Sequence, residues 1–182
     1  VATDGHRLAS VEAPLPAGSE NMPGVIVPRK AVTELRKLID ESGDEVAISM
    51  SESKIRFSFD NAVLTSKLID GTFPDYQRVI PSGNDKDMKV NCKLFSDAVD
   101  RVSAISSEKS RAIKLVLSSG LLALSASSPE HGSAEEEIEV NSEGDSVEIG
   151  FNSAYLLDIS RQFECDPDLV SFADGNSPLI LR

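Results

Sequence analysis

The sequence predicts an α+β fold in which a strand–helix–three-strand unit is repeated, with helices on one face of antiparallel sheets. Three segments carry apolar residues at helical spacing, and each is followed by runs of strand-like alternation. Short loops with Gly or Asn separate several of these runs, as hairpins require. The helical segments begin roughly 60 residues apart, and a recurring spacing of that size indicates a repeated supersecondary unit.

The first helical pattern begins at Pro28, a residue favoured at the first position of a helix, and runs to about Asp40. One apolar stripe is expected to face inward, and it consists of Ala31, Val32, Leu35, Leu38 and Ile39. Strand-like alternation follows in three runs, which are Val46, Ile48 and Met50, then Ile55, Phe57 and Phe59, then 63–68.

The second helical pattern runs from about Lys93 to Ile105, and the third begins near Asn152, whose side chain suits an N-cap. The inward residues are Phe95, Ala98, Val99, Val102 and Ile105 in the second helix and Leu156, Ile159 and Phe163 in the third. The strands expected after the second helix are 113–117, 121–125 and 134–140, and those after the third are 169–172 and 179–181.

Composition indicates an ordinary globular protein. The 182 residues are 40% apolar and 26% charged, enough for one large domain or two small ones. No apolar run approaches the ~20 residues that cross a bilayer. Cys92 and Cys165 lie far apart without metal-ligand spacing, which favours a reduced cytosolic protein with buried thiols. Because the first residue is Val1 rather than Met, we expect the natural N-terminus to be missing.

The distribution of charged residues along the chain is more informative than the net charge. The net charge of −12 is atypical of a DNA-binding domain, but a ring around DNA needs basic residues only on its inner wall. The first helix has such a face opposite the Leu35 stripe, made by Arg29, Lys30, Arg36 and Lys37. This face either lines DNA or is simply solvated. The other helices mix signs, with Lys93 and Arg101 beside Asp97 and Asp100, and Arg161 near Asp158.

Two motifs stand out. The stretch 73–81 reads F-P-D-Y-Q-R-V-I-P and joins two similar segments, yet it is too aromatic and apolar for a solvated linker. The stretch 1–9 reads V-A-T-D-G-H-R-L-A, with a turn signal at Asp4-Gly5 between apolar residues. With G-F-N-x-x-Y at 150–155, these motifs resemble those of the bacterial DNA polymerase sliding clamp, the β subunit of the replicative polymerase III.

The resemblance implies a ring-shaped processivity factor of DNA replication that encircles duplex DNA and tethers partners. It covers essentially the whole chain, and it makes residues 1–80 the later part of the middle clamp domain and 81–182 the C-terminal domain lacking its last strand. It further implies a cytoplasmic homodimeric ring without cofactors. Its partners would be sequence-independent double-stranded DNA, the replicative polymerase and the clamp loader.

The resemblance also implies a pocket for short peptides of the type Gln-Leu-x-Leu-Phe. Carried over by motif, the pocket residues are Thr3, Gly5, His6, Arg7, Leu8, Pro74, Arg78, Val79, Asn152 and Tyr155. Leu8, Pro74 and Val79 offer an apolar floor, and Tyr155 can stack and donate a hydrogen bond. The alternative is interdomain packing with no ligand.

Two further surfaces follow from the same resemblance. Arg29, Lys30, Arg36 and Lys37 would face DNA. The C-terminal domain would meet the first domain of another subunit through Ala104 and Ile105, with Glu130, Glu135, Glu136 and Glu137 as candidate acids. Without the resemblance, the glutamates could form a cation site or a charged strand edge that blocks unwanted pairing.

Catalysis has little support in the sequence. Asp4 and His6 could form a dyad on one strand face, but no candidate nucleophile or metal-ligand spacing accompanies them. A pocket-shaping turn is the favoured role for His6. We therefore expect an accessory subunit of a DNA-directed DNA polymerase rather than an enzyme. The alternative is a generic peptide-binding α+β module without DNA.

Overall fold

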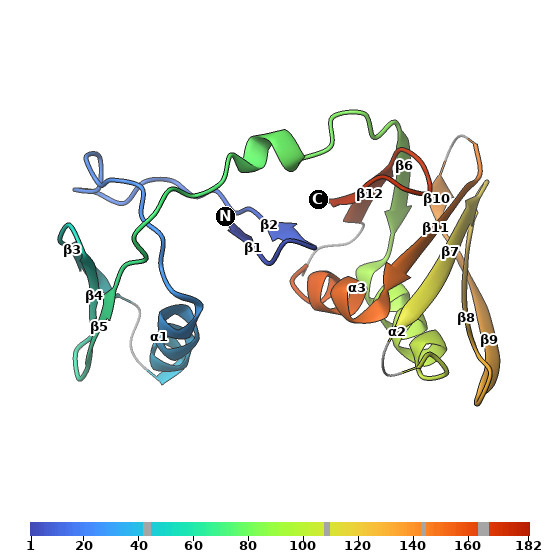
Figure 1. Ribbon diagram of the computed structural model, residues 1–182, viewed down its shortest axis with the longest axis horizontal. Coiled ribbons are helices and arrows are strands. Elements are labelled where there is room, and N and C mark those ends of the chain that lie inside the picture. Colours follow the sequence, from blue (N-terminus) through green and yellow to red (C-terminus); the bar gives the residue numbers. More distant parts are fainter. Residues whose placement is uncertain (42–44, 108–109, 143–144, 164–167) are drawn as a thin grey trace. The chain divides into compact units, whose positions relative to one another are not determined.

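The computed structural model describes residues 1–41, 45–107, 110–142, 145–163 and 168–182 (Figure 1). The chain divides into two compact units, one of residues 1–2 and 8–77 and the other of residues 3–7 and 78–182. The predicted strand–helix pattern of an α+β fold is confirmed in both units. Cys165 lies outside the described residues, whereas Cys92 is buried and its thiol donates to the carbonyl of Ser160 at 3.5 Å.

The first unit contains one helix and one antiparallel sheet of three strands. These elements are α1 (Arg29–Glu41), β3 (Ala47–Met50), β4 (Lys54–Ser58) and β5 (Val63–Lys67), and the strand order is β3-β4-β5. The period-2 alternation of β4 turns Ile55 and Phe57 inward, and together with Phe59 they form a small buried core. Leu35 and Leu38 of α1 pack against this core.

Part of the predicted α1 stripe is wrong. Val32 is 50% exposed and Ile39 is 47% exposed, whereas Ala31 is buried. Val32 and Ile39 are seven residues apart and share one flank of the helix, while the three short strands cover the side that carries Ala31, Leu35 and Leu38. In addition, residues 10–28 form no strand ahead of α1, and they include several prolines that cannot donate to a ladder.

The second unit holds two antiparallel four-stranded sheets. The first sheet has the order β11-β7-β8-β9 and is formed by β7 (Ala112–Ser118), β8 (Leu121–Ser128), β9 (Gly132–Glu139) and β11 (Val147–Asn152). The second has the order β10-β6-β12-β13 and is formed by β6 (Lys86–Val90), β10 (Asn141–Ser142), β12 (Asp168–Phe172) and β13 (Ile180–Leu181).

Two helices of this unit pack against each other, α2 (Cys92–Ser103) and α3 (Ser153–Ser160). Helix α2 also contacts β7, β8 and β9 (Figure 1). Asn91 caps α2 by accepting a hydrogen bond from the amide of Leu94 at 2.8 Å. The core joins both sheets and both helices, and its fully buried members include Met88, Ala98, Val99, Leu122 and Leu124.

Both helices end before their last expected inward residues. Ile105 and Phe163 lie beyond α2 and α3 and are half-buried. At the end of α2, the Ser103 hydroxyl donates to the carbonyl of Asp100, and the Ser106 hydroxyl donates to the carbonyl of Ser103. Such local side-chain bonds compete with helix propagation. In the described residues, no helix is long and apolar enough to span a membrane.

Two leucines of β8, one buried and one exposed, provide a test of the core assigned to the second unit. Leu124 is completely buried, whereas Leu121 is 40% exposed. Leu124→Ala leaves a cavity and should lower the free energy of unfolding by about 2–5 kcal/mol. Leu121→Ala should change it by less than about 1 kcal/mol. Urea unfolding of both variants checks this, and equal losses would contradict the assignment of the core.

Candidate functional site

The segment Thr3–Arg7 forms a tight turn between β1 (Ala2–Thr3) and β2 (Leu8–Ala9). The Thr3 hydroxyl donates to the carbonyl of Arg7 at 2.8 Å and accepts the amide of Gly5 at 3.2 Å. Gly5 has a φ of 87°, which favours glycine. The predicted turn at Asp4-Gly5 is thus confirmed.

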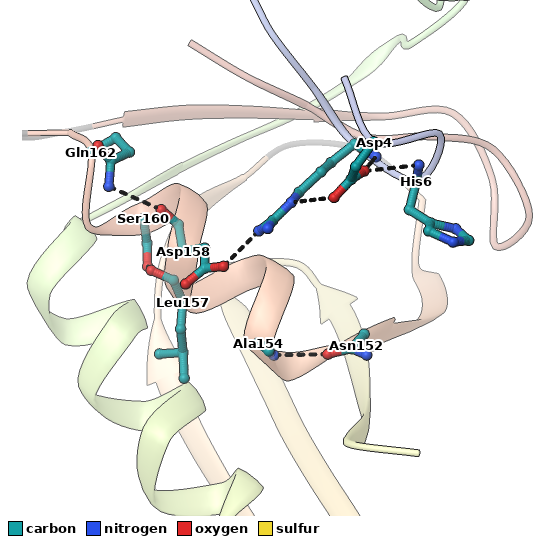
Figure 2. Close-up of polar contacts among 9 residues, drawn as sticks. Asp4, His6, Asn152, Ala154, Leu157, Asp158, Ser160 and Gln162 are labelled. Carbon is teal, nitrogen blue, oxygen red and sulfur yellow. Dashed lines mark hydrogen bonds and ion pairs between the residues drawn. The ribbon is translucent and has the colours of Figure 1, made fainter. Parts of the chain in front are cut away.

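The carboxylate of Asp4 stabilises this turn by accepting hydrogen bonds from His6 and Arg7. Its Oδ1 accepts the backbone amides of His6 and Arg7, both at 3.0 Å, and its Oδ2 accepts Nε of Arg7 at 3.1 Å. The backbone hydrogen bonds from His6 and Arg7, followed by the Arg7 side chain, lower the pKa of Asp4 to about 2. An Asp4–His6 dyad is not formed, because the two residues lie in a turn and Asp4 bonds the amide of His6 rather than its ring (Figure 2).

Arg7 connects the turn to α3. Its Nη1 donates to Oδ2 of Asp158 at 2.7 Å while its Nε contacts Asp4, so one guanidinium bridges two carboxylates. The hydrogen bond to Asp158 is the main cause that raises the pKa of Arg7. Figure 2 shows Asp4 on the turn and Asp158 on the helix, joined through this bridge. Sequence reasoning missed Asp158 as a site residue and expected Arg161 near it.

Both residues that follow Gly5 contact the ring of Tyr155. The His6 ring stacks with it at a centroid distance of 5.9 Å and an interplanar angle of 22°. The guanidinium carbon of Arg7 lies 4.8 Å from the ring centroid, a cation–π distance. The structure therefore brings together His6, Arg7 and Tyr155, three of the predicted pocket residues.

Asn152 takes the role that was predicted for it at the start of α3. Its side-chain oxygen accepts the amide of Ala154 at 2.9 Å, which satisfies one of the unpaired N–H groups of the first turn (Figure 2). The cap fixes where α3 begins and hence where Tyr155 stands in its first turn. Asn152 and Tyr155 are both half-buried.

The remaining predicted pocket residues lie close to the boundaries of the two units. Leu8 is half-buried at the start of β2, and Pro74 is exposed. Arg78 and Val79 lie in a short 3₁₀ helix, Tyr76–Val79, where Val79 is 64% exposed. This local helix was not predicted from the linker motif.

The basic residues of α1 are all exposed, namely Arg29, Lys30, Arg36 and Lys37. Glu34 pairs with Lys37 at 3.2 Å. Two cations of α2 pair with acids on α2 and β9. Lys93 pairs with Asp97 at 2.6 Å, and Nε of Arg101 donates to Glu136 of β9 at 3.0 Å.

The glutamates of β9 lie on an edge strand of the first sheet of the second unit. Glu135 and Glu137 are exposed, whereas Glu136 is half-buried against Arg101, which lowers its pKa by hydrogen bonding. In the described part of the chain, no three His, Cys, Asp or Glu side chains are grouped to hold a metal ion. Ala104 is exposed at the C-cap of α2. Nη2 of Arg161 lies 4.0 Å from Oδ1 of Asp100.

Two open cavities lie away from the predicted pocket residues. One, of about 290 Å³, lies between α1 and β5 and is lined by residues that include Ala31, Glu34 and Leu64. The other, of about 720 Å³, lies on the sheet β11-β7-β8-β9, where Lys114 pairs with Glu148 at 3.3 Å.

The pKa of Asp4 provides a test of the turn. Because the folded value of about 2 is below the usual value of 3.8, the stabilisation is complete above pH 3.8 and is lost as the pH falls through 2. A carboxyl NMR titration should show Asp4 inflecting near pH 2. Arg7→Gln should raise the inflection only partly, because the two backbone amides remain. An inflection at the usual value in the unmodified protein would contradict the turn geometry.

Comparisons with known proteins give the same family over the whole chain. The model of the DNA polymerase III beta subunit central domain matches residues 1–75, and that of its C-terminal domain matches residues 77–182. The beta sliding clamp of Caulobacter vibrioides NA1000 is 49% identical over 181 residues, covering 100% of this chain and 49% of that protein. The beta sliding clamp of Escherichia coli K12 is 39% identical, covering 97% of this chain and 48% of that protein.

Solved structures agree with these relatives. The sliding clamp of Bartonella birtlesii LL-WM9 matches with a TM-score of 0.95 and 53% identity, over 100% of this chain and 52% of that one. A Bartonella birtlesii clamp bound to griselimycin matches with a TM-score of 0.87 and 51% identity, over 92% and 45%. The chain spans about half the length of the curated relatives it matches. With both domain models matched in order, the chain belongs to the bacterial DNA polymerase III beta subunit, or sliding clamp, family.

Proposed function

We propose that the chain is part of a processivity factor of DNA replication. In this proposal the full-length protein is a cytoplasmic, ring-shaped homodimer that encircles double-stranded DNA without reading its sequence. It tethers the replicative polymerase and the clamp loader through short peptides of the type Gln-Leu-x-Leu-Phe. It is an accessory subunit of a DNA-directed DNA polymerase and performs no chemical step itself. Family membership supports this function.

In the same proposal, residues 1–80 form the later part of the middle clamp domain. Residues 81–182 form the C-terminal clamp domain. The division of the chain into two compact units near residue 77 supports a boundary in this region.

One observation carries the peptide site: His6 and Arg7 lie against the ring of Tyr155. Two motifs that lie about 150 residues apart in the sequence supply these groups. The aromatic ring of Tyr155 offers a large contact area, and the arginine stem adds apolar surface beside it. Asn152, which caps α3, supports the same site by fixing the start of the helix.

The exposed residues of the linker motif support the apolar part of the pocket. Val79 is 64% exposed in the short 3₁₀ helix, and an exposed branched side chain gains from being covered by a ligand. A relative also binds a ligand, since a clamp 51% identical to this chain was solved with griselimycin. We infer that Thr3, Gly5, His6, Arg7, Leu8, Pro74, Arg78, Val79, Asn152 and Tyr155 serve peptide binding in this chain.

The exposed face of α1 supports the contact with DNA. Phosphate contacts by Lys and Arg carry affinity without sequence information, which suits a ring that slides. For the subunit interface we propose Ala104 and Ile105 as the apolar part, with Glu135, Glu136 and Glu137 on β9 as the acidic part. Glu135 and Glu137 are exposed on this edge strand, whereas Glu136 is engaged by Arg101.

Peptide binding can be tested at Val79. In the full-length protein, Val79→Ala should cost roughly 1–3 kcal/mol of affinity for a Gln-Leu-x-Leu-Phe peptide, as for a buried anchor contact. That corresponds to a loss of about ten- to hundredfold, measurable by fluorescence polarisation. Val11→Ala is the matched control, because Val11 is 87% exposed and is not part of the proposed site. Equal affinities for both variants would remove the linker motif from the pocket.

Contact with DNA can be tested on α1. Replacing Arg29, Lys30, Arg36 and Lys37 by Gln in the full-length protein should weaken binding uniformly across sequences, and each lost phosphate contact should lower the salt slope by roughly one. The control replaces Lys54, Arg56 and Lys67, which are exposed on β4 and β5 of the same unit. An unchanged slope in the α1 variant would place this helix away from the DNA, whereas no DNA binding by the unmodified protein would favour a peptide-binding module without DNA.

A further inference from the structure

The turn Thr3–Arg7 contacts α3 through side chains. Residues 3–6 are exposed, and the strands on either side have two residues each. The turn is ordered internally by Thr3 and Asp4. In the part of the chain that the structure describes, His6 stacks on Tyr155, while Arg7 contacts both Tyr155 and Asp158.

Helical geometry explains how one arginine makes both contacts. Tyr155 and Asp158 are three residues apart on α3, so their side chains emerge on the same face. Arg7 therefore lies near the Tyr155 ring, with its carbon Cζ 4.8 Å from the centroid, while Nη1 reaches Asp158 at 2.7 Å. Leu156 is buried on the opposite side and anchors the helix in the core, so Asp158 is presented to Arg7 from an anchored helix.

An isolated ion pair at this exposure would stabilise little, because solvent screens it. Here the pair belongs to a network, since the same guanidinium also donates to Asp4 and lies over an aromatic ring. Asp4 in turn accepts the amides of His6 and Arg7. The position of Arg7 and the conformation of the turn are therefore coupled.

We propose that Asp158 is a positioning residue for the peptide site. By pairing with Arg7, it holds the turn and its His6–Tyr155 contact in the arrangement that the peptide meets, without touching the peptide itself. This inference rests on the proposed function and adds to it a residue that is absent from the motif-derived site. Preorganisation of this kind increases affinity because less ordering is needed on binding.

The test compares Asp158→Asn, which keeps the shape and removes the charge, with Asp100→Asn in the full-length protein. Asp100 is an exposed aspartate of α2 and lies 4.0 Å from Arg161, so it controls for loss of a surface charge. For Asp158→Asn, the affinity for a Gln-Leu-x-Leu-Phe peptide should fall roughly three- to tenfold. Amide hydrogen exchange of residues 3–7 should accelerate, while the thermal midpoint stays at that of Asp100→Asn.

A double-mutant cycle separates positioning from a general structural role. In an Arg7→Gln background, Asp158→Asn should have no further effect on affinity or exchange, because its partner is already absent. Asp158→Glu, which restores the carboxylate, should recover part of both. The proposal is overturned if Asp158→Asn behaves like Asp100→Asn, or if its effect persists undiminished in the Arg7→Gln background. If the unmodified protein binds no peptide, the proposed peptide site fails, and exchange in the turn alone decides whether Asp158 positions it.

Discussion

The burial of α2 is the constraint on which the second unit depends. Ala98 and Val99 are completely buried, and Phe95 is nearly so, in a core that both sheets share. Separating α2 from the sheets would expose this apolar stripe to water, at a free-energy cost of about 25 cal/mol per Å². Because α2 also packs on α3, the core fixes the helix that carries Tyr155 and Asp158.

The corner between β11 and α3 links this core to the residues of the proposed peptide site. Phe151 and Asn152 still pair with β7, and the next residue, Ser153, begins the helix. The amide of Ser153 donates to the carbonyl of Arg111 at 2.8 Å, which ties the first turn of α3 to the chain before β7. Buried Leu156 then fixes the rotation of α3, so that Tyr155 and Asp158 meet the turn Thr3–Arg7. In the proposed site, the helix side is anchored in the core through Leu156, and the turn side meets it through side-chain contacts.

The features of the fold that depend on local interactions could be predicted from the sequence. The three helices, the Asn152 cap and the turn at Asp4-Gly5 follow from apolar spacing and from groups that satisfy nearby backbone amides. Exposure of Val32 and Ile39 could not be read from periodicity, because it depends on how far the sheet extends under α1. Asp158 was missed for a similar reason. A single acid on a helix gives no signal until the fold brings Arg7, 151 residues away, to its carboxylate.

The local arrangement of charged residues matters more for DNA binding than the net charge of the chain. The net charge of −12 would repel DNA if charges acted together, but salt screens exposed charges beyond about 8–10 Å. Each surface therefore acts through its own residues. On α2, Lys93 pairs with Asp97 and Arg101 with Glu136, whereas the first three turns of α1 carry four exposed cations and a single acid, Glu34, before Asp40 and Glu41 at the end of the helix. A local excess of cations on one helix is therefore compatible with an acidic chain.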